Sequence, residues 1–125
     1  MKNLLLLILA IVNQAALAEC PRKNITEYSH MTKEELVAVY CAQLNDFYEN
    51  SQKGSKYFEL HQKAVDSGSL ALSTQFFNSM IHYNEIADCS TDNLNNAFSV
   101  LRKDHGIKTE DEIECDKKTT STKDK

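Results

Sequence analysis

Residues 33–52 read KEELVAVYCAQLNDFYENSQ, and this stretch decides the fold class. At about 100° per residue, its apolar side chains fall in one arc roughly 140° wide, the pattern of an amphipathic helix. The arc contains Leu36, Val37, Tyr40, Cys41, Leu44, Phe47 and Tyr48. Thr32 is a good N-cap for this segment, and Glu35 completes a Thr-x-x-Glu capping box. We therefore expect a helix over 33–52 that Gly54 ends.

Three further amphipathic segments follow, over 55–67, 70–88 and 92–104, and Gly68 and Gly106 are expected stops. In the first, the expected buried face contains Tyr57, Phe58, Leu60, Ala64 and Val65. The second has two adjacent apolar stripes, which predicts a central helix packed on two sides. One stripe contains Leu72, Phe76, Met80, Tyr83 and Ala87, and the other contains Leu70, Phe77 and Ile81. The last is expected to bury Leu94, Ala97, Phe98 and Leu101.

No segment alternates apolar and polar residues with a period of two, so no sheet is expected. The pattern predicts an all-α protein, a small four-helix antiparallel bundle over residues 19–115. A second capping box over 109–112 predicts one short turn before Cys115. Residues 116–125 contain no apolar residue and are expected to form a disordered tail.

Residues 1–18 have the three parts of a secretory signal peptide. Lys2 supplies the positive start, Leu4–Val12 form the apolar run, and Ala16–Ala18 form an A-x-A cleavage site. Nine apolar residues are too few for a bilayer span, which takes about 20. A lipid anchor on Cys20 is not expected, because the residue before it is the long anion Glu19. We expect cleavage between Ala18 and Glu19, a secreted or periplasmic product and no membrane anchor.

Four cysteines in a short exported chain predict two disulfides. The four, Cys20, Cys41, Cys89 and Cys115, allow three pairings, and the sequence does not choose among them. Cys20–Cys41 with Cys89–Cys115 is preferred here because each pair closes a short loop. No two cysteines are close enough for a C-x-x-C zinc site, so no metal is expected.

The composition excludes several classes of function. The chain of 125 residues has 14 basic and 18 acidic residues, a net charge of −4, so general nucleic-acid binding is not expected. It contains no G-x-S-x-G, H-E-x-x-H, phosphate loop or G-x-G-x-x-G motif. We therefore expect no enzyme activity and no cofactor.

The interpretation that remains is a disulfide-stabilised helical module that binds another exported or periplasmic protein, as an inhibitor, an immunity factor or a chaperone-like factor. The alternative is a carrier that holds a small apolar ligand between its helices. Candidate pocket residues are His61, Tyr57, Tyr40, Phe76 and Tyr83. His61 lies in an apolar arc, where it is either a partly buried histidine bonded to a tyrosine or a carbonyl, or a pH sensor that titrates near about pH 5–6. Asn24-Ile25-Thr26 is a glycosylation sequon that matters in a eukaryotic host only.

Overall fold

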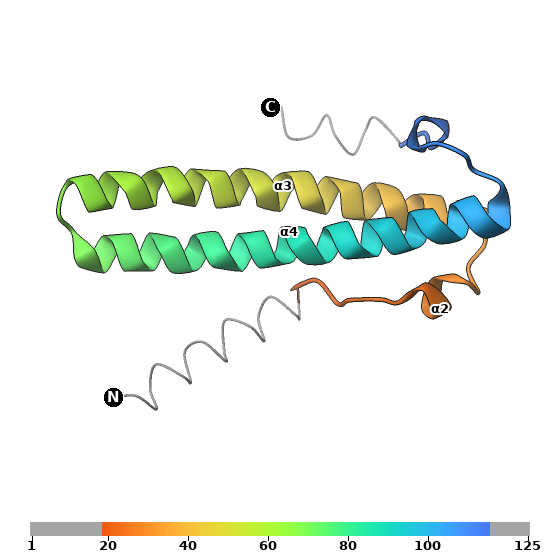
Figure 1. Ribbon diagram of the computed structural model, residues 1–125, viewed down its shortest axis with the longest axis horizontal. Helices are drawn as coiled ribbons and strands as arrows, with labels where there is room; N and C mark the ends of the chain where they lie inside the picture. The colour runs from red at the N-terminus through yellow and green to blue at the C-terminus, as the bar shows by residue number, and fades with distance from the viewer. Residues whose placement is uncertain (1–18, 116–125) are drawn as a thin grey trace.

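The computed structural model describes residues 19–115, which form a long antiparallel helical hairpin (Figure 1). Its two helices are α3, Lys33–Asp66, and α4, Leu70–His105, of 34 and 36 residues. At 1.5 Å per residue they are about 51 and 54 Å long. A short helix α2, Ile25–Tyr28, precedes them, and a 3-10 turn η1, Glu110–Glu112, follows. The all-α class is confirmed, because no strand occurs among the residues that the structure describes.

Two long helices take the place of the four expected over 33–52, 55–67, 70–88 and 92–104. Residues 19–115 therefore do not form the expected four-helix bundle. Gly54 does not end a helix but lies buried inside α3. The carboxamide of Asn84 from α4 lies against it, where a Cβ at residue 54 would overlap the carboxamide oxygen. The polar stretch at Ser90 also continues as helix, and Ser90 is fully buried within α4.

The other helix ends lie where the sequence places them. The Thr32 side chain accepts a hydrogen bond from the Glu35 backbone N–H at 3.2 Å, as the capping box predicts. Gly68 and Gly106 have φ angles of 77° and 72°, the left-handed region that glycine adopts without strain. Gly68 therefore makes the α3–α4 turn, and Gly106 ends α4.

The two long helices meet along a seam whose residues recur at alternating intervals of four and three. Every seam residue is buried or half-buried. The seam of α3 is Leu36, Tyr40, Gln43, Phe47, Asn50, Gly54, Tyr57, His61 and Ala64, and that of α4 is Ser73, Phe76, Met80, Tyr83, Ala87, Ser90, Leu94, Ala97 and Leu101. The ring contacts of Tyr57 with Tyr83 and of Tyr40 with Phe98 fix the antiparallel register of this seam.

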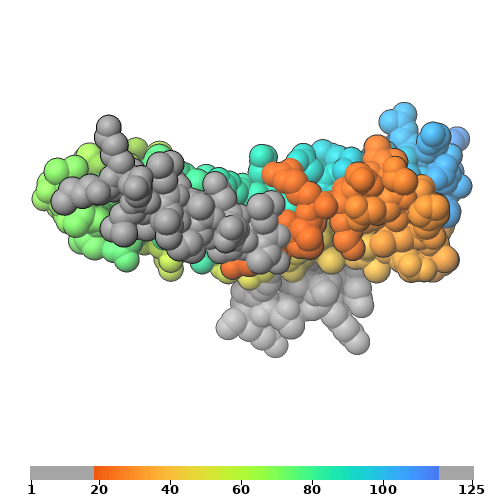
Figure 2. Space-filling model, turned by 90° about the horizontal axis from the view of Figure 1, so that it is seen from below, coloured from red at the N-terminus to blue at the C-terminus, as the bar shows by residue number. Residues whose placement is uncertain are grey.

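One end of the hairpin is covered by the segments before α3 and after α4 (Figures 1 and 2). Residues 19–31 lie beside α4, and residues 107–115 return to α3. We call this part, residues 19–45 and 86–115, the covered end. Its core consists of Tyr28, Leu36, Tyr40, Ala97, Val100, Leu101, Ile107 and Ile113. The main hydrophobic core thus lies at the end of the hairpin away from the Gly68 turn.

The two predicted disulfides form, but the preferred pairing is wrong. Cys20 bonds to Cys89, and Cys41 bonds to Cys115, with sequence separations of 69 and 74 residues. The preference for short loops failed because residues 19–31 run along α4 rather than α3, which brings Cys20 to Cys89. Two disulfides are consistent with an extracellular or other oxidising compartment.

The predicted signal peptide over 1–18, the cleavage after Ala18 and the predicted tail over 116–125 all lie outside the described residues. Among residues 19–115, neither long helix combines the length with the apolarity that crossing a membrane requires.

Candidate functional site

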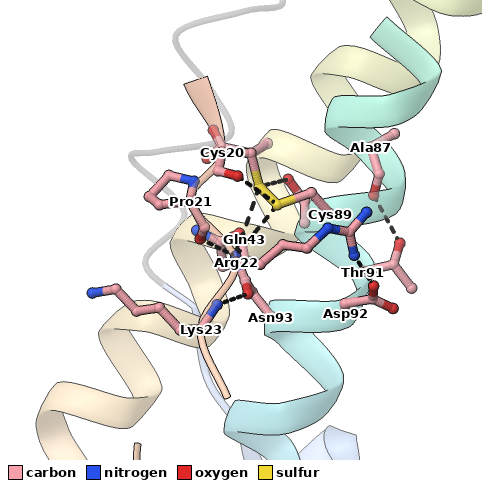
Figure 3. The surroundings of a disulfide bond; sticks show 12 residues. Cys20, Pro21, Arg22, Lys23, Gln43, Ala87, Cys89, Thr91, Asp92 and Asn93 are labelled. Atoms are coloured by element: carbon pink, nitrogen blue, oxygen red, sulfur yellow. Dashed lines mark hydrogen bonds and ion pairs between the residues drawn. A yellow bond between two sulfur atoms is a disulfide. The ribbon is translucent and has the colours of Figure 1, made fainter. Parts of the chain in front are cut away.

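Asn93 anchors the N-terminal segment to the hairpin beside the Cys20–Cys89 disulfide (Figure 3). Its side chain is 2% exposed. Its Nδ2 donates to the Pro21 carbonyl at 3.0 Å and to Gln43 Oε1 at 3.3 Å, and its Oδ1 accepts from the Lys23 backbone N–H at 2.9 Å. All these partners belong to the N-terminal segment or to α3, so Asn93 holds the parts of the covered end together. The sequence did not reveal this role, because nothing in the pattern separates Asn93 from its asparagine neighbours.

Four of the five predicted pocket residues come together in the seam. The rings of Tyr57 and Tyr83 stack with their centroids 5.6 Å apart, and Tyr57 also lies 6.2 Å from Phe76. His61 follows one turn later on α3. Tyr40 lies elsewhere, in the core of the covered end, because 17 residues of helix, about 25 Å, separate it from Tyr57. The five residues therefore do not line one site.

His61 is half-buried, and its Nδ1 lies 2.8 Å from the Ser73 carbonyl oxygen. A carbonyl only accepts, so Nδ1 carries the proton. This geometry matches the carbonyl-bonded interpretation of His61, and the pH-sensor interpretation stays a prediction.

Asn24 is exposed at the N-cap of α2, where its Oδ1 accepts from the Glu27 backbone N–H at 3.0 Å. The sequon is thus on the surface, and its use in a eukaryotic host stays a prediction.

Three surface hollows of the described residues do not contain the predicted pocket residues. One of them, about 430 Å³, is an open groove on α3 beside the Cys41–Cys115 disulfide. It is lined by Glu34, Val37, Ala38, Cys41, Ala42, Asn45, Asp46 and Glu114. A second hollow, between the N-terminal segment and α4, is lined mainly by charged and amide side chains such as Arg22, Asp92 and Asn96. Within residues 19–115, no group of three His, Cys, Asp or Glu side chains could hold a metal ion.

The part of the hairpin with the most exposed apolar surface is the distal arm, which we define as residues 48–81. No segment other than α3 and α4 lies there among the described residues in Figure 1. Five of the seven large apolar side chains exposed in residues 19–115 belong to one set in this arm. The set, with half-buried Ile81 added, is Tyr48, Phe58, Val65, Leu70, Phe77 and Ile81, and we call it the apolar face.

The helical register places these six side chains on the same flank of the seam. On α3, Phe58 and Val65 precede and follow His61 by three and four residues, so the three are surface neighbours. On α4, the Phe77 ring lies 5.4 Å from the His61 ring. In an antiparallel pair of right-handed helices, the positions that follow the seam residues of both helices fall on one side. Phe58 and Val65 of α3 therefore lie on the same side as Leu70 and Phe77 of α4.

The apolar face carries no charge. The positions between its members are Ser51, Ser55, Gln62 and Thr74, all neutral. The opposite flank of the arm carries Glu49, Lys53 and Lys63. An ion pair of 3.7 Å joins Lys53 to Glu49 there, and Lys53 also lies over the Tyr83 ring. Lys56 and Glu59 share a surface hollow with Tyr48, Ser51 and Ser55, at the edge of the apolar face. The arm thus has one solvated flank and one neutral apolar flank.

Sequence reasoning placed Phe58 and Val65 in a buried face, and this expectation is wrong. Their exposed fractions are 47% and 55%. Only part of the apolar positions of α3 can face α4, because one antiparallel neighbour covers only the seam. The signal for the apolar face was nevertheless present: the second stripe of Leu70, Phe77 and Ile81 predicted packing on two sides. The structure supplies one of these neighbours, α3, and leaves this stripe uncovered within residues 19–115.

Searches among protein-family models, curated proteins and solved structures find no match to this chain. Function is therefore inferred from the geometry alone.

Burial raises the pKa of the Tyr40 hydroxyl above its usual 10.0, and nearby Glu110 and Tyr48 add to the effect. The folded state therefore holds this proton more tightly than the unfolded state. The resulting stability is complete below about pH 10 and is lost as the pH rises through the higher folded pKa. We expect the free energy of unfolding, measured with urea, to fall above pH 10 less steeply in Tyr40→Phe than in the wild type. Tyr57→Phe, 17 residues further along α3, is the control, and equal slopes for Tyr40→Phe and wild type would contradict the expectation.

Proposed function

We propose that this chain works by binding another exported protein, and that the apolar face of the distal arm is the binding surface. The single observation behind this proposal is that large apolar side chains of two helices lie uncovered on one neutral flank. Uncovered apolar patches on exported proteins favour protein interaction sites, since each exposed ring or leucine costs free energy in water. An inhibitor, an immunity factor or a chaperone-like factor is the class of protein that this arrangement suits.

The covered end supports this assignment. Two disulfides and the hydrogen bonds of Asn93 hold the terminal segments there, so the distal arm extends from a rigid end of the hairpin. A surface on two packed helices presents its side chains in a fixed arrangement, which lowers the entropy lost on binding. The chemistry of the face suits an apolar helix or helical hairpin of the partner, since it offers rings and branched chains without charges.

Site-specific photo-crosslinking tests this proposal. In the full chain, produced in its own host, we expect Phe77→p-benzoylphenylalanine to give at least about tenfold more protein adduct than Leu72→p-benzoylphenylalanine. Leu72 is a matched control because it is 47% exposed, as Phe58 is, and lies on the opposite flank. A second variant, Phe58→Glu, should remove the adduct at residue 77, because it places a charge in the face.

The adduct is identified by mass spectrometry and counts whether it is another protein or a second copy of this chain. Equal adducts at residues 77 and 72, or none at residue 77, would show that the face is not a protein-binding surface.

The rival proposal is a carrier of a small apolar ligand. It would be favoured if the protein co-purified with a lipid. It would also be favoured if an apolar fluorescent probe bound the wild type with one-to-one stoichiometry and did not bind the Tyr57→Ala variant. The described hollows lend it no support, since Tyr57, His61, Phe76 and Tyr83 line none of the three.

A further inference from the structure

We propose that the apolar face is occupied by a second copy of this chain, so that two distal arms form an antiparallel four-helix bundle. This inference rests on the proposed function, because it names the partner of the same surface.

The pattern of the distal arm is that of a bundle helix rather than that of a simple hairpin. A helix with one antiparallel neighbour needs apolar residues only along its seam, whereas a bundle helix also needs the adjacent flanking row. In the distal arm both helices have that extra row. On α3 it contains Phe58 and Val65, and on α4 it contains Leu70 and Phe77. The sequence thus specifies two helices that are each prepared for a second neighbour.

At the covered end, the chain itself supplies this extra cover. Residues 107–115 bring Ile107 and Ile113 into the core, and the Cys41–Cys115 disulfide fixes them there. In the distal arm, no described residue plays this part. The chain has one other long apolar segment, Leu4–Val12, which the expected cleavage after Ala18 removes. Residues 116–125 contain no apolar side chain. No segment among residues 19–115 covers the face, and we infer that another molecule does.

A second copy matches the face in chemistry, shape and size. The side chains within both surfaces are uncharged, and Lys56 and Glu59, which lie beside Tyr48 at the edge, have opposite signs, so little charge is desolvated when two copies meet. A two-fold axis places the same patch on both partners, and a hairpin is half of a four-helix bundle. With about 80–100 Å² on average for each of the six side chains, the contact buries about 500 Å² per copy, or about 1,000 Å² in total. This area reaches the lower limit of specific protein interfaces, so the dimer is expected to be reversible.

The experiment is sedimentation equilibrium of the protein as isolated from the cells that export it, across concentrations from about 1 to 100 µM. We expect a reversible monomer–dimer equilibrium. The Phe58→Glu/Phe77→Glu variant should raise the dissociation constant at least about 100-fold, because each change acts twice in a two-fold interface. The matched control, Leu72→Glu, should leave the constant within about threefold of the wild type.

Circular dichroism of both variants shows whether the hairpin is intact, and Phe77→Leu provides a milder variant that should weaken the dimer only slightly.

A wild-type protein that stays monomeric throughout this range overturns the second-copy proposal. The proposed function survives that result if residue 77 still forms adducts with another protein, and it fails only if residue 77 forms none. A dimer that Leu72→Glu dissociates and the Phe58/Phe77 double variant does not would also overturn this proposal, because the contact would lie on the opposite flank.

Discussion

Replacing Cys41 and Cys115 with serine should lower the free energy of unfolding by roughly 4 kcal/mol. The bond joins residues 74 apart, so it removes much of the conformational freedom of the unfolded chain. Its loss also frees residues 107–115, which bring Ile107 and Ile113 into the core beside Tyr40. The free energy of unfolding of a small domain is about 5–15 kcal/mol in total, so this loss is a large fraction of its stability.

The measurement is chemical unfolding followed by circular dichroism, with the remaining disulfide intact. Cys20→Ser/Cys89→Ser is the companion variant, because that bond closes a loop of similar size, 69 residues, and should cost about as much. A loss below about 1 kcal/mol in the Cys41/Cys115 variant would mean that the core holds residues 107–115 without the bond.

Leu101→Ala should cost about 3–5 kcal/mol, because this residue is fully buried in the core of the covered end. It lies in the seam of α4 near Leu36, where both terminal segments add further contacts. Shortening the leucine side chain to that of alanine leaves a cavity. The cavity stays open because the residues around it are held in place from several directions. The urea midpoint should fall without a change in the slope of the transition.

The comparison is Leu72→Ala in the distal arm, which should cost less than about 1 kcal/mol because Leu72 is 47% exposed. Similar losses for the two leucines would indicate that stability is spread evenly along the hairpin, contrary to the position of its core.

The sequence predicted the helical class, the Thr32 cap and the Gly68 and Gly106 helix ends because each depends on local geometry. A capping box and a left-handed glycine are decided by the residues within one turn. The same local reasoning failed at Gly54, which continues α3 at a buried position against Asn84, a residue 30 positions later in the chain. A glycine that ends a helix and a glycine that packs against a partner helix look the same in one sequence.

The candidate site was only partly predictable for a related reason. Periodicity showed that Phe58, Val65, Leu70 and Phe77 lie on apolar stripes, yet it does not say which stripe a neighbour covers. That outcome depends on where the terminal segments lie, which the Cys20–Cys89 and Cys41–Cys115 bonds decide. Three pairings were open from the sequence, so the uncovered flank could not be identified before the pairing was known.

The seven-residue spacing of the seam has a consequence for how this architecture can vary. Adding seven residues to α3 before Gly68 and seven to α4 after it restores the alignment of every pair. Such an insertion would lengthen the hairpin by about 10 Å without disturbing either cross-link at its base. The length of the distal arm can therefore change in steps of seven residues per helix without a change in the covered end, which contains the main core and both disulfides.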